Sequence, residues 1–355
     1  SFWKGIVAWV GGHAMIDYLM RQKLTPQWDL VVGSQPGGWT LEMRVSFRDL
    51  AQLGYSEADV ADGGSGLRVI NVSAPSNPYE VGFYDTPGNA NGVAVAGSYA
   101  YIADEKGGLR IADVSSPSNP REVSSWMVSW PNQSAWDVTV TGGYAYVAYS
   151  GAGVWVVDVS APSNPRDVGH YYQPTGFAEA VAVAGSYAYV AYESAGLRVL
   201  RISSPSNPYD VGSYETLGYT TGTTVIGNHA YVADGYTGLK IVSVTSPSNP
   251  VLVGSRELYG FAWDVAVVGS YAYVADGHGG GLKVLNISSP SNPFVMGSYY
   301  AEPNDGATDV AVVGSYAYVA YGTSGLRVVN VSSPSYPYEV GYVDTPGSAN
   351  GVVVI

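Results

Sequence analysis

Acidic side chains stand at one recurring place in this sequence, just before a short apolar strand pattern. The four residues are Asp137, Glu179, Asp264 and Asp309. Tryptophan stands beside two of them, as Trp136 and Trp263. Oxygen ligands in such a setting suit a hard cation such as calcium, or a polar ligand such as a sugar. The competing interpretation, which the sequence favours, is that each carboxylate accepts hydrogen bonds from nearby backbone amides.

Other residues that carry chemistry are sparse. There is no cysteine, so thiolate nucleophiles, disulfides and zinc–thiolate sites are excluded. The histidines fall at different phases of the repeat, without the spacing of metal ligands; they are His13, His170, His229 and His278. No nucleophile elbow, phosphate-binding loop or dinucleotide fingerprint is present. We therefore expect a protein that is not an enzyme and that has no cofactor, with calcium as the one candidate.

A turn of the form SPSNP divides most of the chain into repeats. Its first proline recurs at intervals of 42 to 45 residues, at Pro75, Pro117, Pro162, Pro205, Pro247, Pro290 and Pro334. Proline fixes φ and removes a backbone donor, while Ser and Asn bond their own backbone, so each turn is a rigid corner. We assign these turns a structural role and no chemistry.

Strand patterns surround each of these turns. In one repeat they run Asp264–Gly269, Gly269–Asp276, Gly281–Ile287 and then a segment of the YEVGxY type after the turn. Tyrosines two residues apart, such as Tyr271 and Tyr273, share one sheet face and can fill a wedge between neighbouring sheets. Four strands at this period describe a propeller blade. The sequence predicts an all-β fold, a propeller of seven four-stranded blades preceded by a non-repeat N-terminal segment.

Third-strand segments such as GLRVINVSAPSNP and GLRVVNVSSPSYP resemble those of the LVIVD-repeat β-propeller family. The resemblance covers roughly residues 56–355. It implies a propeller fold and a location outside the cell or on its surface, and it implies no particular activity.

The two ends of the repeat region complement each other. The chain ends in an inner-strand pattern, Gly351, Val352, Val353, Val354 and Ile355, whereas the first repeat has no convincing inner strand before Ser56. We expect this last strand to complete the first blade and close the ring, since unpaired strand edges are unfavourable. The alternative is that Leu41–Phe47 fills the slot and leaves the last strand to enter a neighbouring molecule.

Residues 1–50 do not match the repeat, so we divide the chain into an arm or cap over 1–50 and a propeller over 51–355. In the arm, Lys4–Val10, Asp29–Val32 and Trp39–Phe47 have strand character, and His13–Lys23 has the pattern of a short helix. Aromatic anchors for an assembly contact include Phe2, Trp3 and Trp9. A lid that packs on the propeller is the alternative role.

Composition narrows the choice of partners and compartment. The net charge of −13 repels nucleic acid, and no apolar stretch is long enough to span a bilayer. A low-charge surface rich in tyrosine, and a first residue other than Met, favour an exported protein. We expect a structural, self-assembling surface subunit whose partners are copies of itself. The alternative is a monomeric surface module that binds a protein, a glycan or a cation at the channel mouth, and a hydrolase is disfavoured.

Overall fold

The computed structural model describes residues 27–35, 38–46, 56–128, 133–277, 279–301 and 306–355. The chain divides into two compact units, Ser1–Tyr55 and Ser56–Ile355. This boundary lies five residues beyond the division at residue 50 expected from the sequence. No helix occurs among the residues that the structure describes, and so none there is long and apolar enough to cross a membrane.

The first unit contains one described hairpin, made of β1 (Gln27–Gln35) and β2 (Gly38–Ser46). The two strands pair antiparallel, with Leu41 opposite Val32. The expected strand Asp29–Val32 falls on this hairpin, and so does the expected strand Trp39–Phe47 up to Ser46. Residues 41–46 pair only within this two-stranded sheet and so do not occupy the open slot of the first blade, while Phe47 lies outside the described residues. The other features expected in the arm lie outside the described residues: the anchors Phe2, Trp3 and Trp9, the strand Lys4–Val10 and the helix His13–Lys23.

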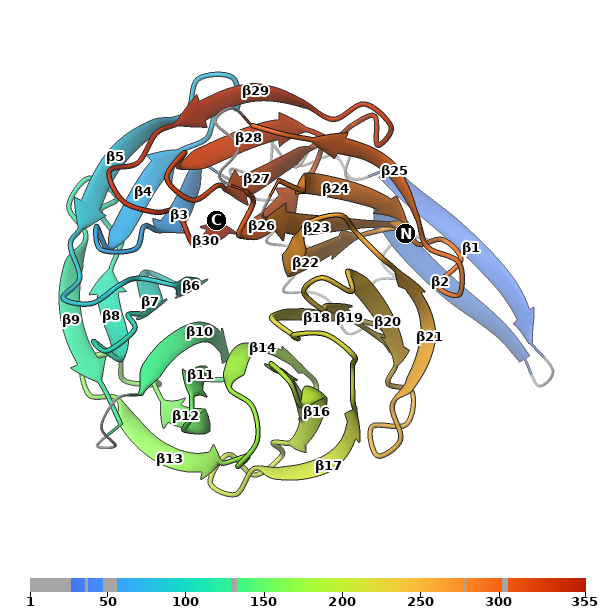
Figure 1. Cartoon of the computed structure of the whole chain (residues 1–355), viewed down its shortest axis with the longest axis horizontal. Helices are drawn as coiled ribbons and strands as arrows, with labels where there is room; N and C mark the ends of the chain where they lie inside the picture. Colours follow the sequence, from blue (N-terminus) through green and yellow to red (C-terminus); the bar gives the residue numbers. More distant parts are fainter. Residues whose placement is uncertain (1–26, 36–37, 47–55, 129–132, 278, 302–305) are drawn as a thin grey trace, which may run out of the picture. The chain divides into compact units, whose positions relative to one another are not determined.

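The second unit is a ring of seven four-stranded antiparallel sheets, which confirms the predicted propeller (Figure 1). The first blade contains β30 (Gly351–Val354), β3 (Glu57–Ala61), β4 (Leu67–Asn71) and β5 (Tyr79–Tyr84). The second contains β6 (Gly92–Ala96), β7 (Tyr99–Ala103), β8 (Leu109–Asp113) and β9 (Arg121–Trp126). The third contains β10 (Ser134–Thr141), β11 (Tyr144–Ser150), β12 (Gly153–Asp158) and β13 (Arg166–Tyr171).

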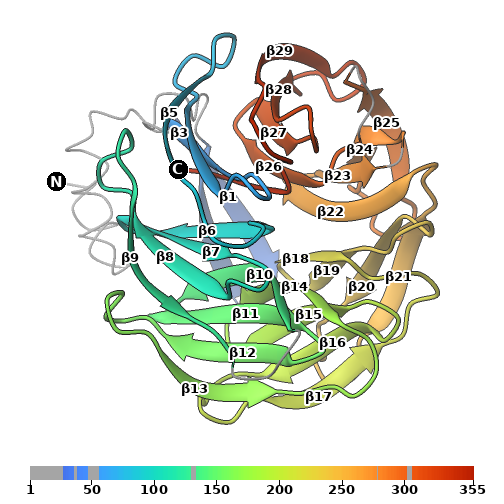
Figure 2. The ribbon, with the colours of Figure 1, turned by 60° about the vertical axis from the view of Figure 1, so that its left-hand side comes forward.

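The remaining blades continue the same order from the centre outward. The fourth contains β14 (Ala178–Ala184), β15 (Tyr187–Tyr192), β16 (Gly196–Arg201) and β17 (Tyr209–Tyr214). The fifth contains β18 (Gly222–Ile226), β19 (His229–Ala233), β20 (Leu239–Ser243) and β21 (Val251–Arg256). The sixth contains β22 (Phe261–Val268), β23 (Tyr271–Gly277), β24 (Gly281–Asn286) and β25 (Phe294–Tyr299). The seventh contains β26 (Asp309–Val313), β27 (Tyr316–Ala320), β28 (Leu326–Asn330) and β29 (Tyr338–Val343). Figure 2 shows the strands of each blade lying side by side.

The ring closes through the C-terminal strand. β30 pairs antiparallel with β3, with Val353 opposite Asp59, and the amide of Ser56 donates to the carbonyl of Ile355 at 3.2 Å. Before β30, the Thr345 hydroxyl donates to buried Asp62 at 2.5 Å. The last strand therefore occupies the slot that the sequence leaves open in the first repeat.

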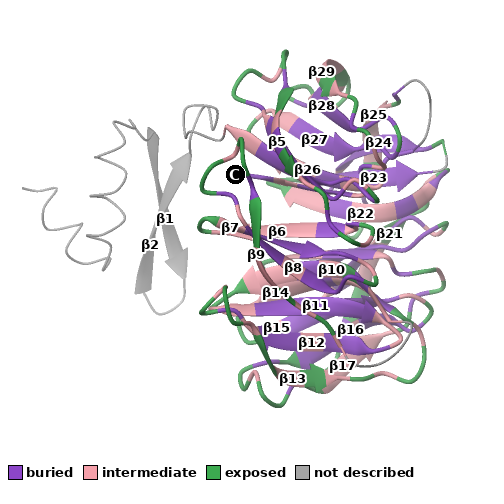
Figure 3. Cartoon of the chain, turned by 90° about the vertical axis from the view of Figure 1, so that its left-hand side faces the viewer, coloured by how far each residue is buried: buried purple, intermediate pink, exposed green. Residues whose placement is uncertain are grey.

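The hydrophobic core lies between blades, because both faces of most sheets are covered by a neighbour. Tyr101 and Leu109 of the second blade share one cluster with Val138 and Tyr149 of the third. The tyrosine at the centre of the second strand fills the wedge there, as its position in the repeat predicts. Figure 3 shows the buried residues concentrated in the two middle strands of the blades, such as β11 and β12, whereas inner strands such as β6 are mostly of intermediate exposure.

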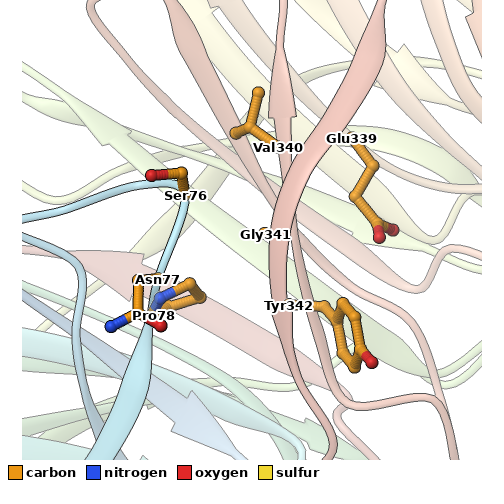
Figure 4. Close-up of a pocket in the computed structure, with 7 residues that line it drawn as sticks. All are labelled: Ser76, Asn77, Pro78, Glu339, Val340, Gly341 and Tyr342. Atoms are coloured by element: carbon orange, nitrogen blue, oxygen red, sulfur yellow. The ribbon is translucent and has the colours of Figure 1, made fainter.

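The SPSNP turns fasten the outer rim. Gly341 on β29 lies against the turn of the first blade, and a Cβ added to it would stand 2.4 Å from the Pro75 carbonyl oxygen. Figure 4 shows Ser76, Asn77 and Pro78 beside this strand. In the second blade Ser124 takes the equivalent place, and its hydroxyl donates to the Pro162 carbonyl at 2.5 Å. The turns are corners, as predicted, and they are also junctions between blades.

Candidate binding site at the channel mouth

Residues from all seven blades line one cavity of about 450 Å3 where the inner strands begin. They are Asn91, Gly92, Trp136, Asp137, Glu179, Ala180, Thr221, Thr223, Trp263, Asp264, Thr308, Asp309 and Asn350. Each inner strand starts at this mouth, so the repeat delivers its residue at the same place seven times. The four carboxylates and two tryptophans singled out in the sequence are thus brought together.

Polar side chains just before the inner strands tie each blade to the next. The Thr308 hydroxyl donates to the Ala349 carbonyl at 2.8 Å, and the Asn350 amide donates to the Ala90 carbonyl at 3.1 Å. The Asn91 and Thr221 side chains bond the equivalent carbonyl oxygens. These residues therefore have an architectural role, which leaves the other lining side chains to supply binding chemistry.

Two of the carboxylates accept backbone amides from two blades at once. Asp137 accepts from the amide of Val138 at 2.7 Å and from that of Val181, in the fourth blade, at 2.9 Å. Asp309 accepts in the same way from Val310 and from Val352 of the closing strand, both at 2.6 Å. The interpretation favoured from the sequence, amide binding, therefore holds for these two side chains, although both still line the cavity.

Burial shifts the ionisation of all four carboxyl groups upward. Removal from water raises the pKa of Asp137 to about 6, against the opposing effect of its two amide donors. Burial, with the nearby charge of Glu193, raises the pKa of Glu179 to about 7. Asp264 and Asp309 form a hydrogen-bonded pair, and burial together with the Asp309 charge raises the pKa of Asp264 well above its usual range.

Aromatic rings form one side of the approach to the cavity. Trp263 lies 4.5 Å from Phe261, measured between ring centroids, and Phe261 lies 4.8 Å from Tyr236. Tyr236 and Trp136 are exposed. The three rings thus form a row of contacts from exposed Tyr236 of the fifth blade to Trp263 on the cavity wall.

Thr223 is a lining residue that the sequence analysis missed. It is 8% exposed, and its hydroxyl has no hydrogen-bond partner among the described residues. The equivalent residue of the other six blades is valine: Val93, Val138, Val181, Val265, Val310 and Val352. Comparison of the aligned repeats contains this signal, because a single hydroxyl among six valines is not needed for packing.

The remaining candidates lie away from the mouth. The His170 ring stacks on Trp155 at 4.5 Å, His229 lies on β19 beside Tyr231, and His13 and His278 are outside the described residues. Asp62 and Asp276 stand at the turns after the second strands of their blades and are buried. Their carboxylates accept hydrogen bonds from the amides of Gly347 and Gly260, in the loops before the inner strands. In the described part of the chain, no group of three or more acidic or histidine side chains is placed to hold a metal ion.

Comparisons with known proteins agree with this architecture. The model of the LVIVD repeat matches seven times, at residues 58–86, 87–128, 133–173, 175–216, 217–257, 259–301 and 306–345. No curated protein matches the sequence.

Solved structures share the fold at low identity. A proposed 6-phosphogluconolactonase from Bacteroides fragilis has a TM-score of 0.70 at 10% identity, over 84% of this chain and 98% of that one. A functionally unknown protein from Desulfotomaculum acetoxidans has a TM-score of 0.65 at 17% identity, over 84% and 98%. BamB from Moraxella catarrhalis has a TM-score of 0.55 at 14% identity, over 94% and 91%. The seven repeat matches and the seven blades that they form show that this chain belongs to the LVIVD-repeat family.

Proposed function

We propose that this propeller is a binding module that works outside the cell or on its surface and takes a small polar ligand group at the channel mouth. The observation that carries the proposal is the cavity itself, to which every blade contributes. A site built by all blades is preorganised by the whole ring, so a ligand need not order it on binding. The low-charge, acidic composition supports the external location.

A binding role is favoured over catalysis by the chemistry of the lining residues. The described lining holds carboxyl, amide, hydroxyl and indole groups. It holds no serine or lysine that would act as a nucleophile, and no histidine that would act as the base to activate one. The phosphorylated ligand implied by the name of the Bacteroides fragilis protein would meet four carboxyl groups and no basic side chain there. We therefore do not extend that activity to this chain.

Thermal unfolding of the full-length chain tests the proposal. The panel contains aliphatic amines, neutral oligosaccharides, sugar phosphates and calcium chloride, each tested on the wild type and on a double variant, Glu179→Gln with Thr223→Val. A ligand at about 100 times its Kd stabilises the folded state by about 2.7 kcal/mol. We expect one class to raise the Tm of the wild type and to raise that of the variant less. If every class acts equally on both proteins, the mouth is not the binding site.

Self-assembly is the second candidate function, and the outer rim supports it. The first residue of the fourth strand is exposed and apolar in five blades: Tyr79, Tyr209, Val251, Phe294 and Tyr338. Such residues on an unpaired strand edge favour contact with another copy. Because β30 is already paired with β3, the proposed contact uses the rim or residues 1–50 and not the C-terminal strand.

Sizing of the chain with and without residues 1–50 tests this second candidate. An assembly that dissociates when the arm is removed supports an arm-mediated contact. An assembly that persists without the arm supports the rim. A monomer in both forms over a wide concentration range would leave the binding module alone.

A further inference from the structure

We propose that the ligand group recognised at the channel mouth is an alkylammonium ion, the charged end of an aliphatic amine. This inference rests on the proposed function, because it names the ligand class of the same cavity. The observations that carry it are the charge of the lining, one unpartnered hydroxyl and the position of the tryptophans. Each points to a cation that also has an apolar stem.

The charge of the cavity is uncompensated. Four carboxyl groups line it, and the described lining residues include no lysine, arginine or histidine. The charged groups whose fields act on these carboxyls are other carboxyls: Asp309 acts on Asp137 and Asp264, Asp137 acts on Asp264, and Glu193 acts on Glu179. Carboxylates removed from water are costly unless a cation pairs with them. A ligand ammonium supplies that missing charge.

Thr223 provides an independent indication of a ligand. Its hydroxyl is more than nine-tenths buried, lacks a partner within the described residues, and belongs to a residue of the cavity wall. A buried hydroxyl without a partner costs free energy, which valine at this position avoids in the other six blades. An ammonium group has three donors, so it can satisfy this oxygen and the carboxylates together.

The tryptophans distinguish an organic cation from a metal ion. Trp136 and Trp263 border the cavity, and an indole face attracts an ammonium by about 0.5–2 kcal/mol while it also packs against methylene groups. A bare divalent cation gains little from either contact. The volume of about 450 Å3 holds several atoms beyond a single ion. A neutral sugar would fit the rings but would leave the carboxylates uncompensated.

Calorimetric titration of the full-length chain with 1,5-diaminopentane tests the proposal, with 1,5-pentanediol as the neutral probe of similar length. An alkylammonium keeps its charge from pH 5 to pH 8, because its pKa is about 10.4. Over the same interval the cavity gains negative charge, because the pKa values of Asp137 and Glu179 are about 6 and 7. We therefore expect diamine affinity to rise at least about tenfold from pH 5 to pH 8, and the diol to bind weakly at both.

Variants locate the effect. Glu179→Gln and Thr223→Val should each weaken diamine binding several-fold at pH 8, whereas Glu215→Gln, an exposed carboxylate that does not line the cavity, should leave it unchanged. In a second series the free diamine is replaced by Nα-acetyl-lysine N-methylamide, whose side chain ends in a free ammonium as a lysine does within a protein. If the lysine probe binds as tightly as the diamine, a lysine side chain of another protein is sufficient as the ligand. If the diamine binds more tightly, the preferred ligand is a free amine.

The outcomes separate this inference from the proposed function. If maltotriose or pentanediol binds as tightly as the diamine, with no rise toward pH 8, the mouth is a binding site and the ammonium assignment is wrong. If calcium binds and the diamine does not, the assignment is likewise overturned in favour of a metal. If no probe distinguishes the wild type from Glu179→Gln, both the inference and the channel-mouth site fail.

Discussion

The first blade is assembled from both ends of the propeller sequence, whereas each of the other six is one continuous stretch of chain. The difference extends to the side chains at its centre. Its second strand carries Asp59 where the other blades carry tyrosine: Tyr101, Tyr146, Tyr189, Tyr231, Tyr273 and Tyr318. Its inner strand carries Val353 where the others carry only alanine or threonine.

These two differences are coupled by register. Val353 and Asp59 lie opposite each other on β30 and β3, so their side chains share one face of the blade. A larger aliphatic residue on the closing strand therefore accompanies a smaller residue on its neighbour. What this exchange leaves is a buried carboxyl group, and neither oxygen of Asp59 has a hydrogen-bond partner in the described structure. The β30–β3 pair, which is the seam that closes the ring, therefore buries a carboxyl group where the other six blades bury a tyrosine side chain.

Removal of residues 351–355 should have the largest effect on this comparison. The deletion removes β30, whose Val352 and Val354 side chains are buried in the core, and exposes the edge of β3. Burial of each valine is worth about 1.5–3 kcal/mol, so we expect a loss of about 3–6 kcal/mol in the free energy of unfolding by urea. The substitution Val353→Thr, which places on β30 the residue found in the third and fifth blades, is the milder control. A truncated chain with an unchanged urea midpoint would show that β30 does not hold the ring.

Asp59 should make the seam sensitive to pH. Burial, reinforced by Glu57, raises the pKa of Asp59 to about 7 in the folded chain, against about 3.9 when unfolded. The folded state binds the Asp59 proton more tightly than the unfolded state does. The contribution of this proton to the free energy of unfolding is therefore full below pH 4 and is lost as the pH rises to 7. At about 1.4 kcal/mol per pKa unit, the loss is about 2–4 kcal/mol.

The variant Asp59→Asn tests this by removing the titration while keeping the shape. Urea unfolding at several pH values should give a shallower fall in stability between pH 4 and pH 8 than in the wild type. Other buried carboxyls with raised pKa values, such as Asp62 and Asp104, contribute the same sign in both proteins, so the difference isolates Asp59. Equal slopes would mean that Asp59 is not buried as described.

Most of this architecture is predictable from the repeat alone. Seven turns, the paired tyrosines and the two incomplete ends determine the number of blades and the slot for the last strand, because a strand pattern without a partner must pair somewhere. The mouth residues are predictable for the same reason, since aligned repeats deliver equivalent residues to one place. Asp137 and Asp309 illustrate the limit: their type indicates a carboxylate, but their amide partners in the next blade depend on the angle between sheets.

Other features depend on contacts that no spacing in the chain encodes. The Asp264–Asp309 pair joins side chains of two blades across the mouth, and Gly341 is required because another blade's turn approaches its Cα. Alignment of the seven repeats of this chain does mark Thr223 and Asp59 as departures from the repeat. It does not say whether either side chain is buried, which decides what the departure does.

Gly341 allows the closing junction to be tested at the rim. In Gly341→Ala the new Cβ would meet the Pro75 carbonyl oxygen at 2.4 Å, so the strand or the turn must shift. Overpacking of this kind costs about 1–3 kcal/mol, and we expect the urea midpoint to fall accordingly. Gly64→Ala is the matched control, because a Cβ added to Gly64 would have the Asn89 side-chain oxygen as its nearest neighbour, at 3.4 Å. If both variants unfold alike, the rim contact is looser than described.

Thr223→Val applies the same comparison to the fifth blade and should have the smallest effect on stability. The change gives that blade the residue found in the other six and removes a buried hydroxyl without a partner. Since the shapes match and the desolvation cost disappears, we expect the free energy of unfolding to rise by about 1 kcal/mol. The same protein should bind a mouth ligand more weakly than the wild type. A gain in stability accompanied by a loss of binding is the mark of a residue kept for a ligand; a loss of stability would instead show that the hydroxyl has a structural partner.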